Sequence, residues 1–330
     1  MPHAFIIGGT GQIGISTAAE LLRSGWTVTC SHTGRREPQK VPPGASLAVL
    51  QRQDTATLAD VMGTVDLLVD TMAFAGRDAD QLAGLSGQFG QLCVISTASV
   101  YADGEGRSID TAGTTGFPEF GGPIPETQAL VPAGPQSYST AKVELEQRLR
   151  ELIMRPLMIL RPCAIHGINS KHPREWWFVK RMLDGRNVIP IVHGGSTFHT
   201  SAAANIAALI STVAGMPGTH ILNAGDPSPP TVRGIGEALA ARLGWSGTFV
   251  DMPPDSEVGS TPWSAPSSMI VGMEAAAALG YQPAGSYSET LPPYVSWMQA
   301  NAADWRTTFP VFSHYGSDPF DYAAEDAALS

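Results

Sequence analysis

The feature that most constrains this chain is a glycine-rich turn near residue 10. The apolar run from Ala4 to Ile7 predicts a buried strand, and the pattern from Ile13 to Ser24 predicts a helix that ends at Gly25. Four glycines with dinucleotide-type spacing stand in this segment: Gly8, Gly9, Gly11 and Gly14. A strand that turns at once into a helix needs such residues, which also let backbone approach a pyrophosphate at the helix N-terminus. The sequence therefore predicts a dinucleotide-binding turn.

Composition argues against several classes of function. The 330 residues carry a net charge of −10, which disfavours nucleic acid as a partner. We see no apolar run long enough to span a membrane and no secretory leader, so we expect a cytoplasmic protein without a membrane partner. The three cysteines, Cys30, Cys93 and Cys163, are expected as buried thiols, and no cluster has the spacing of metal ligands.

The order of elements predicts an α/β fold. Strands are expected at 27–31, 47–50, 65–70 and 91–96, separated by helix-length segments with glycine-rich joints. This alternation is typical of βαβ units in a doubly wound parallel sheet, a Rossmann fold with helices on both faces.

The residues after the second strand bear on the cofactor. Arg35 and Arg36 follow this strand with no acid before Glu37, which favours NADP(H) over NAD(H), because arginine accommodates a 2′-phosphate. A solvated basic loop is the alternative. Asp54 stands after the third strand, where it either reaches the adenine or caps the helix that starts near Thr57.

The fifth strand runs into the hydroxyl-rich segment 96–101, which we expect at the ligand-binding edge of the sheet. A Gly- and Pro-rich stretch, 102–136, follows and predicts a lid or substrate loop. Tyr138 and Lys142 come next, four residues apart on one helix face. We expect the lysine ammonium, a hydroxyl hydrogen bond and a nicotinamide ring to lower the pKa of the tyrosine.

In this order the segments resemble the extended short-chain dehydrogenases/reductases, the family of NAD(P)-dependent epimerases and dehydratases. The resemblance rests on residues 8–14, 96–101, Pro125-Glu126 ahead of Tyr138-x-x-x-Lys142, and 159–167, and extends from about residue 4 to about 300. Residues 174–181 look more like the family's atypical members. The resemblance implies hydride transfer at a carbinol or carbonyl carbon of a small molecule, with sugar nucleotides among the candidates and a homodimer as the common assembly.

The resemblance also implies roles for particular residues. Thr97 takes the Ser/Thr position of the catalytic triad, with Tyr138 as acid/base and Lys142 as its partner. Expected cofactor contacts are Gly8, Thr10, Gly11, Gln12, Ile13, Gly14, Ser31, Thr33, Arg35, Arg36, Asp54, Ala73, Tyr138, Lys142, Pro162 and Ile165. Expected substrate contacts are Ser99, Tyr101, His166, Arg174 and Trp176, with a structural role for His166 and core packing of Trp176 as alternatives.

The departures from the family narrow the reaction. The family's dehydratases place two carboxylates directly after the catalytic threonine, where this chain has Ala98 and Ser99. Because neither side chain is a competent acid or base near pH 7, we expect a reductase or an epimerase and disfavour a dehydratase. A cofactor-binding regulatory or scaffold protein is the alternative from a different class.

The chain is expected to form two domains. Residues 1–165 and 188–225 are assigned to the dinucleotide-binding domain, and residues 166–187 and 226–330 to a smaller, discontinuous substrate-binding domain. The tail, 317–330, is expected to wrap the surface or to be disordered.

Overall fold

The computed structural model describes residues 1–34, 41–315 and 318–330. The chain divides into two compact units, both discontinuous in sequence. Unit 1 comprises residues 1–163, 203–225 and 271–284, and unit 2 comprises residues 164–202, 226–270 and 285–330.

Unit 1 is built on a parallel sheet of seven strands among the described residues, in the order β10-β6-β5-β4-β1-β2-β3. The strands are β1 (His3–Ile7), β2 (Thr27–His32), β3 (Ser46–Val49), β4 (Val65–Asp70), β5 (Phe89–Ile95), β6 (Leu157–Pro162) and β10 (Thr219–Ala224). The order runs outward from β1 in both directions, so the doubly wound Rossmann architecture is confirmed. The central strands are almost entirely buried, as expected for a parallel sheet covered on both faces.

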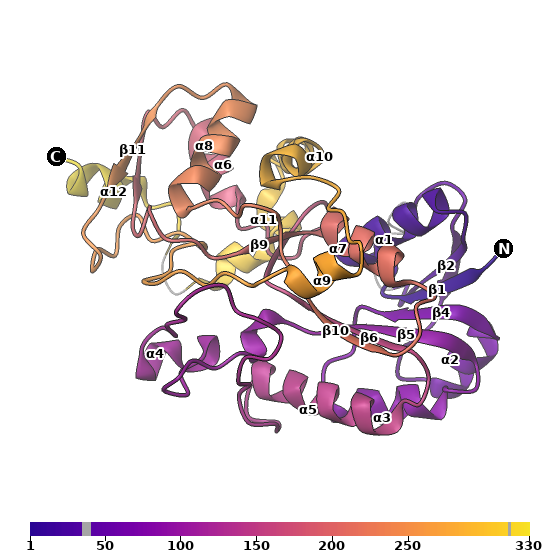
Figure 1. Cartoon of the computed structure of the whole chain (residues 1–330). Coiled ribbons are helices and arrows are strands. Elements are labelled where there is room, and N and C mark those ends of the chain that lie inside the picture. The colour runs from indigo at the N-terminus through magenta and orange to yellow at the C-terminus, as the bar shows by residue number, and fades with distance from the viewer. Residues whose placement is uncertain (35–40, 316–317) are drawn as a thin grey trace. The chain divides into compact units, whose positions relative to one another are not determined.

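Helices cover both faces of this sheet (Figure 1). α1 (Gln12–Arg23) packs beside α7 (Ala203–Val213) on one face, and α3 (Gly76–Gly84) packs beside α5 (Tyr138–Leu152) on the other. Two shorter helices complete the unit: α2 (Thr55–Met62) and α9 (Glu274–Ala278).

The connection from β5 to α5 contains short helices rather than one open loop. They are η1 (Ala98–Val100), η2 (Ile109–Thr111) and α4 (Ala112–Thr115). Isolated bridges join Tyr101 to Leu130 within this connection, and Ile124 to Val271 in the segment 271–284. We refer to residues 102–136 as the long connection.

Unit 2 contains two small parallel ladders. β7 (Ala164–His166) pairs with β9 (Thr200–Ala202), and β8 (Val188–Ile191) pairs with β11 (Thr248–Asp251). Its helices are α6 (Trp176–Leu183), α8 (Val232–Leu243), α10 (Tyr287–Ala300), α11 (Trp305–Thr308), η3 (Pro310–His314) and α12 (Tyr322–Ala328). An aromatic-rich core that includes Trp176, Phe178 and Tyr294 holds these helices together.

Two segments lie elsewhere than expected. Residues 188–202, expected in the dinucleotide-binding domain, group with unit 2, because β8 pairs with β11 and not with the large sheet. Residues 271–284, expected in the substrate-binding domain, group with unit 1, because Val271 bridges Ile124 and α9 contacts β10.

Of the tail that was expected to wrap the surface or to be disordered, residues 318–330 are described and are mostly exposed. Residues 322–328 form α12, and Glu325 is buried with its carboxylate 2.6 Å from the Arg181 guanidinium. Arg181 in turn lies over the Trp177 ring at 3.5 Å. A buried ion pair therefore anchors a segment whose sequence carries no clear pattern.

Candidate active site

The glycine turn between β1 and α1 has the shape that a pyrophosphate requires. Gly8 has φ +76°, a conformation that L side chains rarely adopt. A Cβ on Gly9 would lie 2.5 Å from the Cβ of Cys30, and one on Gly14 would lie 2.4 Å from the carbonyl oxygen of Gly8. Gly11 is the N-cap residue of α1 and provides no side-chain hydrogen bond to the helix. The turn therefore leaves the N-terminus of α1 for an external anion, which fits a dinucleotide phosphate.

Two further residues expected to contact the cofactor, Ser31 and Thr33, differ in their exposure. Ser31 is buried, and its hydroxyl donates to the Ile6 carbonyl at 3.4 Å, whereas Thr33 is exposed. Arg35 and Arg36 lie outside the described residues.

Asp54 caps α2. Its carboxylate accepts hydrogen bonds from the backbone N–H of Thr57 at 3.0 Å and from the Thr57 hydroxyl at 2.7 Å. These bonds lower the pKa of the carboxyl. Of the two roles left open for Asp54, capping is the one that the structure shows.

Tyr138 begins α5 and reaches solvent. Its side chain is 44% exposed, and its ring lies 5.5 Å from that of Phe74. Partial burial raises the pKa of Tyr138; a hydrogen bond with Thr97 opposes the rise, and the nearby Asp110 carboxylate adds to it. The hydrogen bond with Thr97 thus acts in the expected direction, while burial and Asp110 act against it. Lys142 is not among the causes of this shift.

The Lys142 ammonium is hydrogen-bonded to backbone carbonyl groups. Its ammonium donates to the carbonyl oxygens of Ala73 at 2.7 Å and of Ile95 at 2.8 Å. Its Nζ lies 5.7 Å from the centre of the Tyr138 ring. Burial lowers the pKa of Lys142 to about 8, although the Asp70 carboxylate favours its charged form. The ammonium is thus held by backbone carbonyls at the carboxyl ends of β4 and β5.

Sequence reasoning missed the residues that hold this arrangement in place. Asp70 is fully buried and pairs with Arg52 at 2.5 Å, while its other oxygen accepts from the backbone N–H groups of Met72 and Ala73 at 2.8 and 2.9 Å. Asp70 therefore fixes the turn whose Ala73 carbonyl holds Lys142. The available signal was Asp70 itself, because it stands where the resembling family often carries an Asn-Ala-Ala type strand end.

Three hydroxyl groups form a chain beside Tyr138. Thr97 Oγ1 and Ser99 Oγ lie 3.0 Å apart, and the Ser139 hydroxyl donates to Ser99 Oγ at 2.9 Å. Ala98, between the first two, is buried. The structure thus brings Thr97, Ser99 and the start of α5 together, as the sequence predicted.

Tyr101 does not join this chain. It is 0% exposed, and its hydroxyl donates to Asn223 Oδ1 at 2.6 Å and accepts from Arg161 at 3.2 Å. Burial raises the pKa of Tyr101 to about 12. The expected substrate contact is instead part of the buried core of unit 1, where Arg161 also pairs with Glu146 at 2.5 Å.

The remaining expected residues near this edge belong to different units. Pro162 is buried at the end of β6 in unit 1, whereas Ile165 is half-buried in β7 of unit 2.

Unit 2 contains the other expected substrate residues. His166 is 1% exposed, with Nε2 2.7 Å from Asp226 Oδ2. Burial opposes its charge, but the Asp226 carboxylate outweighs burial and raises the pKa of His166. Trp176 is also 1% exposed and packs on Trp305 and Phe309. Both residues therefore have the structural placement that was the alternative to substrate binding.

Arg174 is half-buried, with its guanidinium 5.5 Å from the centre of the Trp263 ring. Burial lowers its pKa.

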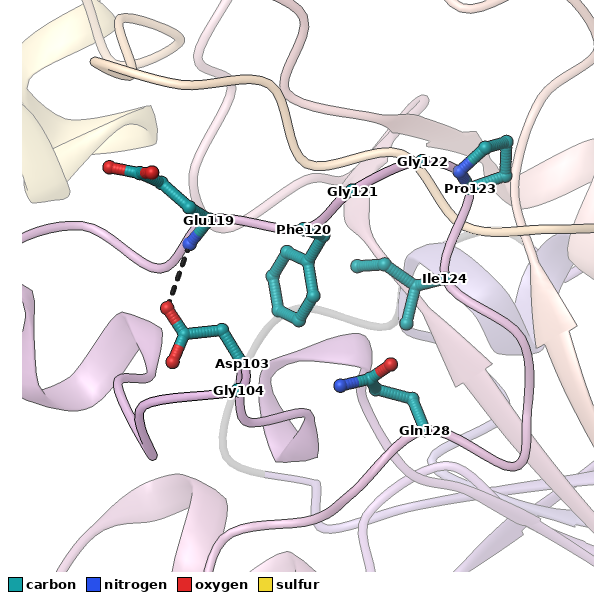
Figure 2. Close-up of a pocket in the computed structure, with 9 residues that line it drawn as sticks. All are labelled: Asp103, Gly104, Glu119, Phe120, Gly121, Gly122, Pro123, Ile124 and Gln128. Atoms are coloured by element: carbon teal, nitrogen blue, oxygen red, sulfur yellow. Dashed lines mark hydrogen bonds between the residues drawn. The ribbon is translucent and has the colours of Figure 1, made fainter.

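A cavity of about 230 Å³ lies within the long connection (Figure 2). Asp103 borders it and accepts a hydrogen bond from the backbone N–H of Glu119 at 2.9 Å. The lining residues are Asp103, Gly104, Glu119, Phe120, Gly121, Gly122, Pro123, Ile124 and Gln128. None of the expected catalytic or ligand-binding residues lines it.

The three cysteines differ in their burial. Cys30 and Cys93 are buried, and Cys163 is half-buried. Burial raises the pKa of Cys30 to about 11. Within the described ranges, no group of three or more His, Cys, Asp or Glu residues is arranged to hold a metal ion. No helix in the same ranges is long and apolar enough to cross a membrane.

Together, the doubly wound sheet and the glycine turn define a Rossmann-like fold. The chain has the Rossmann-like fold of the extended short-chain dehydrogenases/reductases, the NAD-dependent epimerases and dehydratases. The fold predicted from the sequence motifs is therefore confirmed.

Solved structures with this fold include a UDP-glucose 4-epimerase from Thermotoga maritima, crystallised with UDP-glucose. It is 17% identical with a TM-score of 0.69, over 91% of this chain and 99% of that one. A dTDP-glucose 4,6-dehydratase from Bacillus anthracis, in complex with NAD, is 16% identical with a TM-score of 0.67, over 93% and 100%. The epimerase of Thermus thermophilus, also with NAD, is 18% identical with a TM-score of 0.67, over 90% and 99%. No family model and no curated protein sequence matches the chain.

Proposed function

We propose that the chain belongs to this family and is an NAD(P)-dependent enzyme that transfers hydride at a carbinol or carbonyl carbon of a small molecule. The observation that carries the proposal is the placement of an accessible Tyr138 beside Thr97, at the ligand-binding edge of the sheet that also carries the glycine turn. A tyrosine that serves only packing would be buried, whereas Tyr138 is exposed. Sugar nucleotides, which the neighbours' names include, are the first substrates to test.

The cofactor is proposed to bind with its pyrophosphate at the N-terminus of α1, between Gly8 and Gly14. When bound, the nicotinamide supplies the hydride acceptor or donor. We propose NADP(H) over NAD(H) from Arg35 and Arg36. Two of the three neighbours named above were solved with NAD, so this preference rests on the sequence of the present chain alone.

Three residues of the chain have separate roles in the proposed reaction. The Tyr138 hydroxyl gives a proton to a carbonyl oxygen during reduction, or takes one from a substrate hydroxyl during oxidation. Because its pKa is raised, Tyr138 is neutral near pH 7 and is ready to act as an acid. The Thr97 hydroxyl orients the reacting oxygen, and Lys142 brings a positive charge near the Tyr138 ring.

Elimination of water is not part of the proposed reaction. Ala98 cannot titrate, and the Ser99 hydroxyl is engaged by Thr97 and Ser139. Glu126 accepts a hydrogen bond from the backbone N–H of Asn223 at 2.9 Å, and Asp103 is held by Arg107. Reduction and epimerisation both fit the remaining candidate catalytic residues, Thr97, Tyr138 and Lys142.

The test is product analysis with purified protein. UDP- and dTDP-hexoses and small carbonyl compounds are incubated with NADPH, NADP, NADH or NAD, and the products are identified by NMR. We expect an epimer or a reduced alcohol; a 4-keto-6-deoxy sugar would contradict the absence of elimination. Native mass spectrometry of the untreated protein separates the two outcomes, since an epimerase cycle retains its cofactor. Cofactor binding without turnover on any substrate would favour the regulatory or scaffold alternative.

A further inference from the structure

Asp110, in η2 of the long connection, contacts the start of the catalytic helix. Its side chain is exposed, and its Oδ2 accepts a hydrogen bond from the backbone N–H of Ser139 at 2.9 Å. Ser139 is 0% exposed and is the second residue of α5, directly after Tyr138. Its hydroxyl donates to Ser99, which is hydrogen-bonded to Thr97. One carboxylate from a distant loop is thus linked to the residues around Tyr138.

Bonds within the long connection hold Asp110 in this position. Asp103 accepts from the backbone N–H groups of Arg107 and Glu119, each at 2.9 Å, and pairs with the Arg107 guanidinium at 2.7 Å. The backbone N–H of Ser108 donates to the Thr111 hydroxyl at 3.0 Å, which closes the turn that contains Asp110. The segment therefore presents a fixed carboxylate.

We propose that Asp110 is a positioning residue of the proposed reaction: it fixes the start of α5, where Tyr138 stands, and brings a negative charge to that end of the helix. The inference rests on the proposed function for its catalytic meaning. The inference gives the long connection a role that differs from the lid or substrate loop that the sequence predicts.

The groups packed around Tyr138 allow the effect of the Asp110 charge on the pKa of Tyr138 to be isolated. Lys142 approaches from α5, with Nζ 5.7 Å from the ring centre, but its hydrogen bonds go to backbone carbonyls. Phe74 and Thr97, from the turns after β4 and β5, carry no charge. Asp110 is the charged side chain that raises the pKa of Tyr138. Because Asp110 and Tyr138 are both exposed, the effect is modest and salt-dependent.

The experiment titrates Tyr138 directly. Protein labelled with ¹³C at the tyrosine Cζ gives a signal for each of seven tyrosines, and Tyr138→Phe identifies the one at issue. We expect Asp110→Asn and Asp110→Ala each to lower the titration midpoint of Tyr138 by about half a pH unit at low salt, because a like charge is removed. The difference shrinks in ~1 M salt, where the Debye length is about 3 Å. The limb of the kcat profile that requires neutral Tyr138 moves to lower pH by the same amount.

Matched variants separate charge from structure. The side-chain amide in Asp110→Asn retains an oxygen that accepts from Ser139, so that variant keeps the hydrogen bond and loses only the charge. Glu105→Gln removes the same charge from an exposed side chain of the same segment and is expected to leave the Tyr138 midpoint unchanged. An unchanged midpoint in Asp110→Asn overturns the inference, whatever the activity. Full turnover in Tyr138→Phe overturns the proposed function instead, which a shifted midpoint would not rescue.

Discussion

Two clusters of tyrosine, carboxylate and basic side chains can be compared, one in each unit. In unit 1, Tyr138 is 44% exposed and lies beside hydroxyl groups and a lysine. In unit 2, His166 and Asp226 form a pair, and the Glu175 carboxylate accepts from the hydroxyls of Tyr294 at 3.0 Å and Tyr287 at 3.3 Å, all five residues being almost completely buried. The residue types are similar, but access differs.

This difference teaches that residue type alone does not mark a site. The second cluster has the acids and bases of an active site, yet its residues are hydrogen-bonded to one another and almost completely buried. Burial raises the pKa of Glu175 and of both tyrosines in this cluster, which shows the cost of charge there. The predictions below test whether the first cluster serves chemistry and the second serves stability.

The largest expected effect is on turnover. Tyr138→Phe is expected to lower kcat about 10²- to 10⁴-fold, as loss of a general acid typically does, with a much smaller change in cofactor affinity. Steady-state kinetics and cofactor titration measure the two. Tyr294→Phe is the matched control in the buried cluster: it is expected to destabilise the fold and to leave kcat within about tenfold. A larger loss of kcat in the control would break the comparison.

Breaking the buried cluster is expected to cost stability. Asp226→Asn replaces the carboxylate that faces His166 at 2.7 Å and receives the backbone N–H of Ala202 at 2.6 Å. Because a hydrogen bond to a charged group is weakened, we expect a loss of about 2–3 kcal/mol in the free energy of unfolding. Urea unfolding followed by tryptophan fluorescence measures it, with the exposed Asp255→Asn as control. Equal stability of the two variants would contradict a structural role.

The next prediction tests the proposed preference for NADP(H) over NAD(H). Arg35→Ala combined with Arg36→Ala is expected to remove a preference for NADP(H) of about ten- to hundredfold, because each guanidinium–phosphate bond is charge-assisted. Affinity for NAD(H) should change little. Calorimetric titration with both cofactors measures it, and equal affinities in the unsubstituted protein would refute the preference.

The smallest expected effect is a pH dependence of stability from His166. Its folded pKa is raised, so its contribution is fully present below the unfolded value of about 6.5 and is lost as pH rises through the folded value. We therefore expect the free energy of unfolding to decline as pH rises above 6.5. His166→Gln, which keeps a donor for Asp226, should flatten this decline in unfolding curves measured from pH 6 to 9. The raised pKa of Glu175 acts in the same direction, and because His166 opposes that rise, the difference between the two proteins reports on the pair.

Much of the architecture followed from short segments of sequence. The apolar run before Gly8 is β1, the segment after Gly11 is α1, and the expected strand at 65–70 is β4. These predictions held because the strand, turn and helix signals lie within a few residues of one another. The same local signals placed Thr97 at a strand end and Tyr138 at a helix start.

Only the tertiary structure decided which polar groups are accessible. Tyr101 comes after β5, as Thr97 does, and His166 ends β7, yet both pair with residues far away in sequence: Asn223 for Tyr101 and Asp226 for His166. Asp110 reaches Ser139 across 29 positions, and Glu325 reaches Arg181 across 144. No local pattern encodes such pairs, because burial and charge pairing depend on which segments meet in space. The sequence by itself thus determined the scaffold and the candidate catalytic residues, and the packing of distant segments decided their surroundings.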